Sequence, residues 1–439
     1  MFAGAAKNDI TPEDSVWMDG MIRDHTSVGV HDNIYSRVLV LAHNEQLKNA
    51  CVIVSVEVCG LLSRDTYTVR RSVSEKTGIP YQNIIIAATH THSGPATIGF
   101  FNHREKHYLE ELLKKIEISI LDAVKKIRSV KIGLSTTKET TISHYRRLLA
   151  EDGHVVMNWE PYPTDKIKGP LGEVDSEVGI MHIVNANNTE DTVCILFNHA
   201  GHPNIMSGDN YLISGDYPGY AMNRLENKFG GTTLFVNGAQ GTMDIDGLRD
   251  RDWSGVERAG TALSDVVADA IRNMTYSDFS LLHSGFTKYT INPRIITESE
   301  LKWADNILKD TAGSVKTLVD GVGDDYKALL FKRLHDWKNR QIEIEHTCIA
   351  IDDYVFISFP GELFTEIGKM IKDKSSYVHT FIIGLANGEI GYVPTKKAIL
   401  EGGYAVETRE VCNDAEDIIV AQCLTLLNDI YDEIDRKNF

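Results

Sequence analysis

The segment from Ile84 to Pro95 constrains the fold more than any other part of the sequence, because an apolar run ends there in two histidines. The run is typical of a β-strand covered on both faces, and His90 and His92 follow it with one residue between them. Imidazole is a common zinc ligand, and an α/β sheet presents ligand-binding groups at the carboxyl ends of its strands. The segment therefore predicts a site at a strand end, although a structural turn explains a single His-x-His pair equally well.

Four further apolar runs end in polar residues in the same way. The runs and the polar residues that follow them are 193–197 with His202, 232–236 with Asn237 and Gly238, 354–359 with Glu362, and 381–385 with Tyr392. One strand that ends in polar residues is ordinary, whereas five that gather His, Glu and Tyr side chains predict a pocket.

The spacing of strands and helices predicts an α/β fold. Strands are expected at 38–42, 52–56, 84–88, 193–197, 232–236 and 354–359, with amphipathic helices between them, the clearest at 104–128. We expect one large domain, 1–439, with a mixed β-sheet core flanked by helices and the site at strand carboxyl ends. A charged helical insertion at 297–342, with its turn at Gly321 to Gly323, could cover the pocket or form an oligomer surface.

Together these segments resemble the catalytic domain of the neutral/alkaline non-lysosomal ceramidase family. The shared motifs are AATHTHSGP at 87–95, GHP at 201–203, SGDYPGYA at 214–221, PGELFTE at 360–366 and GYVPT at 391–395. The first motif is the most specific, and the resemblance runs over most of the chain. It implies one zinc ion per chain, held by His90, His202, Glu362 and Tyr392.

Such a ligand set suits hydrolysis. Two neutral imidazoles and one carboxylate leave zinc with a net positive charge, which lowers the pKa of a water molecule and polarises a carbonyl group. Two of the four residues also have structural interpretations: Glu362 as an acid favoured at a helix N-terminus, and Tyr392 as a wall tyrosine.

Other residues are expected to act on the substrate. His92 is a candidate oxyanion donor or acid/base group, Tyr392 is expected to help polarise the metal, and the Gly20 N–H is a candidate oxyanion donor that could equally be a turn glycine. The residues expected to bind the substrate are Arg146, Arg147, Asn237, Gly238 and Tyr404.

One departure from the family bears on the substrate. Ceramide-cleaving members have a serine, implicated in catalysis, at the position that Gly238 occupies here, and they add a β-sandwich domain that we do not expect in a chain ending at Phe439. We therefore expect a zinc-dependent hydrolase of an amide or ester bond, lactones and lactams included, in a soluble polar substrate such as a carbohydrate derivative. The alternatives are a ceramide-type amidohydrolase, and a noncatalytic zinc-containing protein that binds a metabolite or carbohydrate.

Composition narrows the partners. A net charge of −17 disfavours binding to nucleic acid or to anionic membrane surfaces. The sequence has no apolar run of membrane-spanning length, no signal peptide and no phosphate-loop, dinucleotide or serine-elbow motif. Its six cysteines form no CxxC pair. We therefore expect a cytoplasmic enzyme that binds a small molecule and has no integral membrane association, with a homo-oligomer left open.

Overall fold

Eight strands form the largest sheet in the computed structural model, which describes residues 1–439 except 45–46, 100–101, 246–249, 278–280 and 438–439. In spatial order they are β14 (Thr232–Asn237), β12 (Asn188–His199), β11 (Glu177–Asn185), β6 (Arg128–Lys138), β1 (Phe2–Asp9), β3 (Tyr35–Ala42), β4 (Cys51–Val56) and β5 (Ile84–Ala88). The sheet is mixed, because β4 pairs with β5 and β12 with β14 in parallel while the other neighbours are antiparallel.

A second sheet of four strands packs face to face on the first. Its strands, in spatial order, are β16 (Leu282–Ile291), β17 (Ile342–Ile351), β18 (Tyr354–Ser358) and β20 (His379–Ile383). Alternate side chains from both sheets form one apolar layer, which includes Ile53, Ile85, Leu196, Ile349 and Phe356. The apolar runs of the sequence are thus strands buried on both faces.

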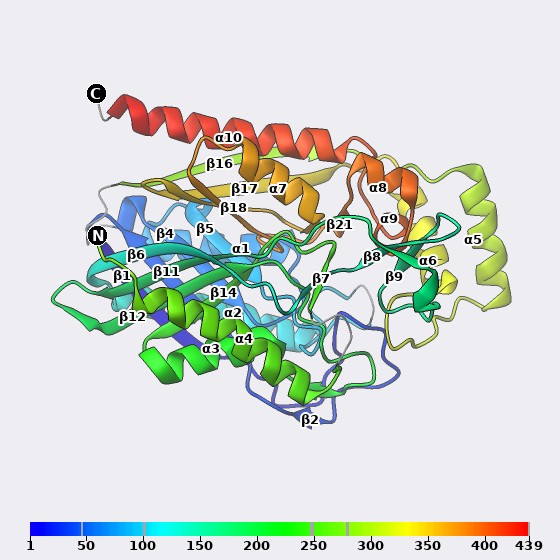
Figure 1. Ribbon diagram of the computed structural model, residues 1–439, viewed down its shortest axis with the longest axis horizontal. Helices are drawn as coiled ribbons and strands as arrows, with labels where there is room; N and C mark the ends of the chain where they lie inside the picture. The colour runs from blue at the N-terminus through cyan, green and yellow to red at the C-terminus, as the bar shows by residue number, and fades with distance from the viewer. Residues whose placement is uncertain (45–46, 100–101, 246–249, 278–280, 438–439) are drawn as a thin grey trace.

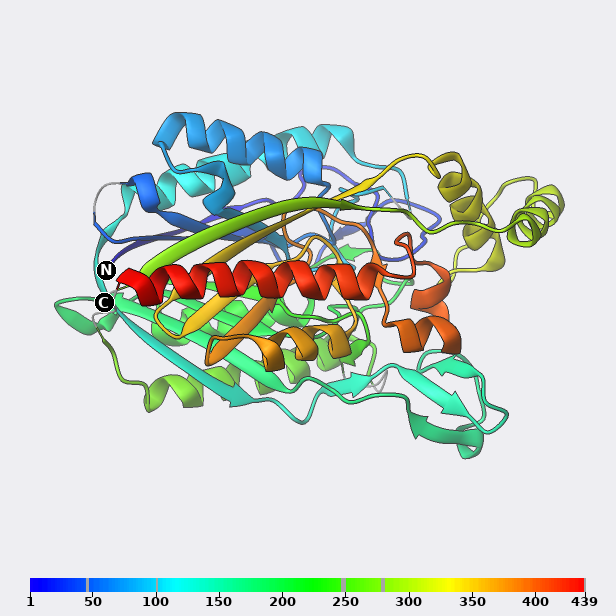
Figure 2. The same cartoon turned by 90° about the horizontal axis from the view of Figure 1, so that it is seen from above.

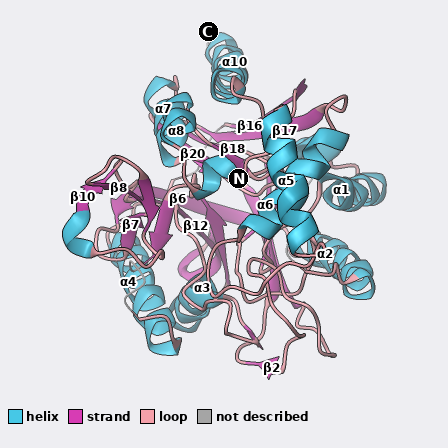
Figure 3. Cartoon of the chain, turned by 90° about the vertical axis from the view of Figure 1, so that its right-hand side faces the viewer, coloured by secondary structure: helices cyan, strands magenta, loops and turns pink. Residues whose placement is uncertain are grey.

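Helices cover the two outer faces, so the molecule has four layers (Figures 1 and 3). The larger sheet is covered by α1 (Ser63–Thr77), α2 (Lys106–Lys125), α3 (Asp216–Phe229) and α4 (Trp253–Arg272), and the smaller sheet by α7 (Thr365–Lys374) and α10 (Ala415–Lys437). Helix α2 agrees with the helix expected at 104–128, and Leu112, Ile116 and Ile120 bury its apolar face. The expected α/β class with a mixed sheet flanked by helices is confirmed.

The remaining elements gather mainly at one end of the layers, whereas both termini lie at the opposite end (Figures 1 and 2). These elements are β2 (Gly29–Val30), β7 (Ser143–Tyr145), β8 (Arg147–Ala150), β9 (Val155–Met157), β10 (Ile167–Pro170), β13 (Leu212–Ile213), β15 (Met243–Ile245), α5 (Glu298–Asp310), α6 (Asp324–Asp336), β19 (Glu362–Leu363), β21 (Tyr392–Val393), α8 (Lys396–Glu401) and α9 (Tyr404–Glu407). Short 3-10 helices occupy Leu47–Asn49, Tyr81–Asn83 and Thr164–Lys166.

The stretch 297–342 contains two helices, α5 and α6, which pack on each other through a small apolar cluster. Helix α5 begins with a capping box between Thr297 and Glu300, and α6 begins immediately after Gly323, where the turn was expected. The division of the chain into one domain with an insertion stays a prediction. Among the helices of the described ranges, none combines the length and the apolar character that a membrane span requires.

Candidate active site

The exits of four strands meet at Asn237, the last residue of β14. Its side-chain amide donates to the backbone oxygens of Thr89, after β5, and of Gly201, after β12, at 3.3 and 2.9 Å. Its own carbonyl accepts from the N–H of Gly384, after β20, at 2.9 Å. Asn237 therefore holds together the loops that carry the site, and it does not itself line the pocket.

His90 turns from the end of β5 toward the pocket. Its backbone has a φ of 76°, a left-handed conformation that is uncommon for a residue with a side chain, and its N–H donates to the carbonyl of Val58 at 3.0 Å. Its Nδ1 lies 2.7 Å from the carbonyl oxygen of Cys59. Because a carbonyl can only accept, Nδ1 carries the proton and Nε2 keeps its lone pair.

His202 is held in the same manner from the loop after β12. Its Nδ1 donates to the carbonyl of Met243 at 2.9 Å, so the lone pair of Nε2 faces Glu362, whose Oε2 is 2.9 Å away. The Arg146 guanidinium lies 3.2 Å from the same Nε2, and the Tyr392 hydroxyl 3.4 Å from it.

Glu362 completes a set of three buried acceptors. Its Oε2 is also 3.6 Å from His90 Nε2, and one ligand atom from each of the three residues lies within 4.8 Å of the others. This oxygen has no hydrogen-bond partner in the described part of the chain. Two imidazole lone pairs and a carboxylate that face one another form a donor set that fits a metal ion.

The protonation states agree with that arrangement. Burial lowers the pKa of His90 to about 4, although the Glu362 carboxylate opposes the shift. Burial alone would raise the pKa of Glu362, but its surroundings, which include the Arg146 guanidinium, hold it below its ordinary value. Near neutral pH the site therefore presents a neutral His90 and an ionised carboxylate.

His92 lies beside the cluster and close to Gly20. Its Nε2 is 3.3 Å from His90 Nε2, its Nδ1 has no hydrogen-bond partner among the described residues, and burial holds its pKa well below the ordinary value. Gly20 has a φ of +90°, and a Cβ atom there would lie 2.4 Å from His92 Cγ. Only a glycine at position 20 allows the backbone to approach the His92 imidazole this closely.

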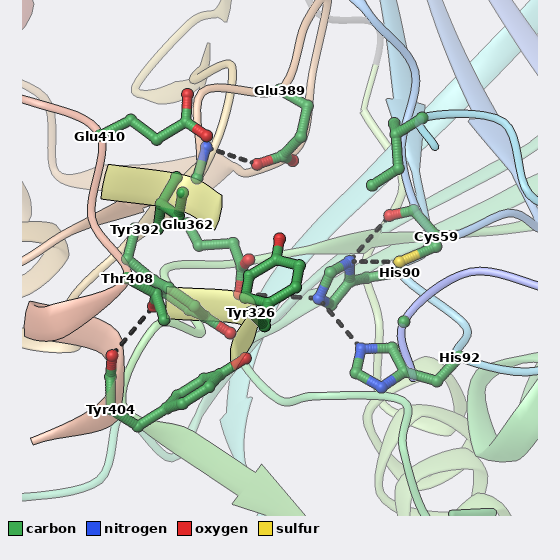
Figure 4. A pocket seen from close by; sticks show the side chains of 14 residues that line it. Cys59, His90, His92, Tyr326, Glu362, Glu389, Tyr392, Tyr404, Thr408 and Glu410 are labelled. Carbon is green, nitrogen blue, oxygen red and sulfur yellow. Dashed lines mark hydrogen bonds and ion pairs between the residues drawn. The ribbon is translucent and has the colours of Figure 1, made fainter. Parts of the chain in front are cut away.

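The pocket beside this cluster is a cavity of about 60 Å³ (Figure 4). Its wall includes Gly20, His90, His92, Glu362, Tyr392 and Tyr404, which were all expected in the site. Helix α6 contributes Tyr326 and Leu330. Of the two roles left open for 297–342, covering the pocket is therefore the one that its position supports.

The two neighbouring arginines face different ways. The Arg146 guanidinium lies over the rings of Tyr392 and Trp159, at 5.1 and 5.4 Å, and donates to the Gly241 carbonyl at 2.7 Å. Arg147 instead donates to Glu401 at 3.0 Å and lines a separate surface groove. The structure thus brings Arg146 to the predicted site and does not bring Arg147 there.

Gly238 likewise lies outside the pocket wall. A Cβ atom at this position would be 3.0 Å from the Cβ and 3.2 Å from the Cα of Ala200. A side chain at 238 would therefore point toward the exit of β12. Neither Gly238 nor Asn237 lines the pocket, so their predicted contact with substrate receives no support from their positions.

Sequence reasoning missed several wall residues, among them Cys59, Glu389, Thr408 and Glu410. Glu389 lies three residues before Tyr392, and Cys59 lies three residues after the strand expected at 52–56, whereas Thr408 and Glu410 follow no pattern that points to a pocket.

The chain is similar to proteins that are described as ceramidases. The family model described as neutral/alkaline non-lysosomal ceramidase, N-terminal, matches residues 2–243. A curated neutral ceramidase of Mycobacterium tuberculosis is 27% identical over 222 residues, which are 47% of this chain and 32% of that protein. The matched region thus spans about a third of the length of that relative.

Two solved structures share the fold. The crystal structure of neutral ceramidase from Pseudomonas aeruginosa superposes with a TM-score of 0.75 at 18% identity, over 97% of this chain and 74% of that one. A structure described as a ceramidase complexed with C2 gives 0.76 at 16% identity, over 98% and 75%. Because the family model covers more than half of the sequence, the chain belongs to the neutral/alkaline non-lysosomal ceramidase family.

Proposed function

We propose that the chain is a zinc-dependent amidohydrolase that cleaves the amide bond of an N-acylated, ceramide-type substrate. The observation that carries this proposal is the convergence of His90 Nε2, His202 Nε2 and Glu362 Oε2 in a buried pocket of a ceramidase-family chain. Membership of the family supports hydrolysis of an amide, and the three facing acceptors support a metal ion as its cofactor.

The chain's own residues have distinct tasks in this proposal. A zinc ion at His90, His202 and Glu362, with Tyr392 as the fourth residue, would supply Lewis acidity at the reacting carbonyl and activate water. The Cys59 and Met243 carbonyls fix the orientation of the two histidines, as partners behind metal-binding imidazoles usually do.

Negative charge that develops on the substrate carbonyl has donors nearby. His92 is neutral and unpaired at Nδ1, and it lies beside His90, so it is placed to donate a proton or a hydrogen bond. The Gly20 N–H on the same wall is a second candidate donor. Arg146 adds a buried positive charge over the ring of Tyr392.

Membership of the family favours a ceramide-type substrate over the soluble polar substrate that was expected from the sequence. The similar proteins are described as ceramidases, which favours an N-acyl amide with lipid-like character. The glycine at 238 had suggested a different substrate, but a side chain there would face Ala200 and not the pocket, which weakens that argument. Polar amides, esters and lactones remain the comparison substrates.

The test is hydrolysis by zinc-loaded protein. Short-chain and long-chain N-acylsphingosines, polar N-acyl amines, esters and lactones are incubated with the enzyme, and products are identified by mass spectrometry. We expect the N-acyl amides to be cleaved fastest. Preference for esters or lactones would contradict the proposed bond, and zinc binding without turnover of any substrate would favour the noncatalytic alternative.

Two histidine variants distinguish the loss of a zinc ligand from the general effect of removing a buried imidazole. His202→Ala should lose zinc and hydrolysis together. His182→Ala removes another buried imidazole, which bonds to Tyr276 and Thr192 away from the pocket, and should keep both. Equal zinc content in the two variants would contradict the assignment of His202.

A further inference from the structure

Two buried carboxyl groups line the pocket on the side away from His90 and His92. Glu389 and Glu410 form this acidic wall, and Tyr326 of α6 lines the same pocket (Figure 4). Neither carboxyl belongs to the proposed metal site. The proposed metal site therefore does not explain why two carboxyl groups line this side of the pocket.

Glu410 already has a strong partner. Its carboxylate forms an ion pair with Arg333, one helical turn beyond the α6 residues that line the pocket, and its backbone carbonyl accepts from Arg294 at 2.7 Å. The charge of Glu410 is thus compensated within the protein, and the pair fixes α6 over the pocket.

Glu389 is only half satisfied. Its Oε1 accepts the N–H of Gly391 at 2.7 Å, but its Oε2 is buried with no hydrogen-bond partner within the described ranges. The residue is 9% exposed, and its side chain lines the cavity. A buried polar atom without a partner needs an explanation, and for a residue that lines a pocket a ligand atom can complete the bonding.

The chemistry of that ligand atom can be narrowed. Burial, reinforced by the neighbouring Glu362, holds the pKa of Glu389 well above its ordinary value and so disfavours the ionised carboxylate relative to an exposed one. An alkyl chain against Oε2 would leave the oxygen unsatisfied, and an ammonium group would require the carboxyl to ionise. A hydroxyl group can accept a hydrogen bond from the protonated acid or donate one to its ionised form.

We propose that Glu389 is a specificity-determining residue whose Oε2 forms a hydrogen bond with a hydroxyl group of the substrate. This inference rests on the proposed amidohydrolase function and extends it, because it assigns a hydroxyl to the part of the substrate that lies against the acidic wall. It selects N-acyl amides with a hydroxyl close to the scissile bond over those with plain alkyl chains.

Matched amides test the proposal. Short N-acyl amines are prepared in sets that differ only in a hydrogen, hydroxyl or amino substituent, placed in the acyl part in one series and in the amine part in the other. We expect the hydroxyl member of one series to exceed its unsubstituted partner in kcat/KM by about tenfold or more, as for a site built around a hydrogen bond. No preference in either series, or a preference for the amino member, would overturn the proposal.

Three variants test whether the preference for the hydroxylated amide depends on Glu389. Glu389→Leu should abolish it by slowing the hydroxyl member alone, whereas Glu389→Gln, which keeps a polar group at both positions, should retain part of it. Glu366→Gln is the matched control, because Glu366 also has an unpartnered Oε2 but lies outside this pocket. An unchanged preference in Glu389→Leu would refute the role of Glu389. Glu389→Ala carries the same test if the leucine variant does not fold.

A binding experiment separates this inference from the proposed function. Calorimetry measures the affinity of the wild type and of Glu389→Leu for the hydroxylated and plain amines and carboxylic acids that the amides would release. Tighter binding of a hydroxylated compound by the wild type, lost in the variant, supports the inference even if no amide is cleaved. Equal affinities in an enzyme that does cleave amides would overturn the inference and leave the proposed function intact.

Discussion

Replacement of Gly20 by alanine should damage the site through one contact. The new Cβ would lie 2.4 Å from His92 Cγ, whereas ordinary contacts begin at 3.4 Å, so the ring or the loop must move by about 1.0 Å. The φ of +90° adds a backbone cost of about 1–2 kcal/mol for a residue with a side chain. Crowding in a packed region typically adds about 1–3 kcal/mol.

We therefore expect Gly20→Ala to lower the free energy of unfolding by about 2–5 kcal/mol. A displacement of about 1 Å at His92 should reduce kcat by about a hundredfold. Urea denaturation followed by tryptophan fluorescence measures the first quantity, and steady-state hydrolysis of the best amide substrate measures the second.

Gly78→Ala is the control, because Gly78 ends α1 with a φ of +79° and its Cβ would meet nothing within 4 Å. It should show the backbone cost of about 1–2 kcal/mol and normal hydrolysis. The reasoning is refuted if Gly20→Ala is no less stable than Gly78→Ala and retains its kcat.

Three further outcomes are expected. Tyr392→Phe should retain more zinc than His202→Ala, as measured by elemental analysis, and equal losses would contradict the weaker role given to the phenol. Burial raises the pKa of Asp19 from 3.8 to about 6 despite hydrogen bonds from the Ile98 and Gly99 N–H groups, so its stabilising contribution is complete below about pH 4 and is lost as the pH rises to about 6. The free energy of unfolding of Asp19→Asn should therefore fall less between pH 4 and pH 7 than that of the wild type, by up to about 3 kcal/mol. A variant whose free energy of unfolding differs from that of the wild type by the same amount at both pH values would contradict this. All six cysteines are free, so a thiol titration of denatured protein without reductant should count six, and a lower count would show oxidation.

The layers of the fold could be predicted because buried strands have a strong local signature. The runs at 84–88, 193–197 and 232–236 all lie within strands. Strands β16 and β17 could not be found in this way, because polar residues interrupt the apolar pattern of both strands and most side chains of β16 are partly exposed. Their place is decided by pairing with each other across a long connection.

The predicted ligands come together because the strands that precede them end at one place. The ends of these strands could be located from the hydrophobic runs in the sequence alone. Arg146 and Arg147 could not be told apart, since adjacent residues in extended chain point to opposite sides and the sequence did not fix the register. The acidic wall could not be predicted for another reason: whether Glu389 Oε2 has a hydrogen-bond partner depends on the tertiary structure and on no local sequence pattern.

Metal analysis combined with reconstitution tests the central claim most directly. Protein purified without chelator should contain about one zinc ion per chain, as expected for the ligand set of His90, His202 and Glu362. Dialysis against a chelator should abolish amide hydrolysis, and added zinc should restore it in the wild type but not in His202→Ala. Hydrolysis that persists in metal-free protein, or a wild type that takes up no transition metal, would contradict the account.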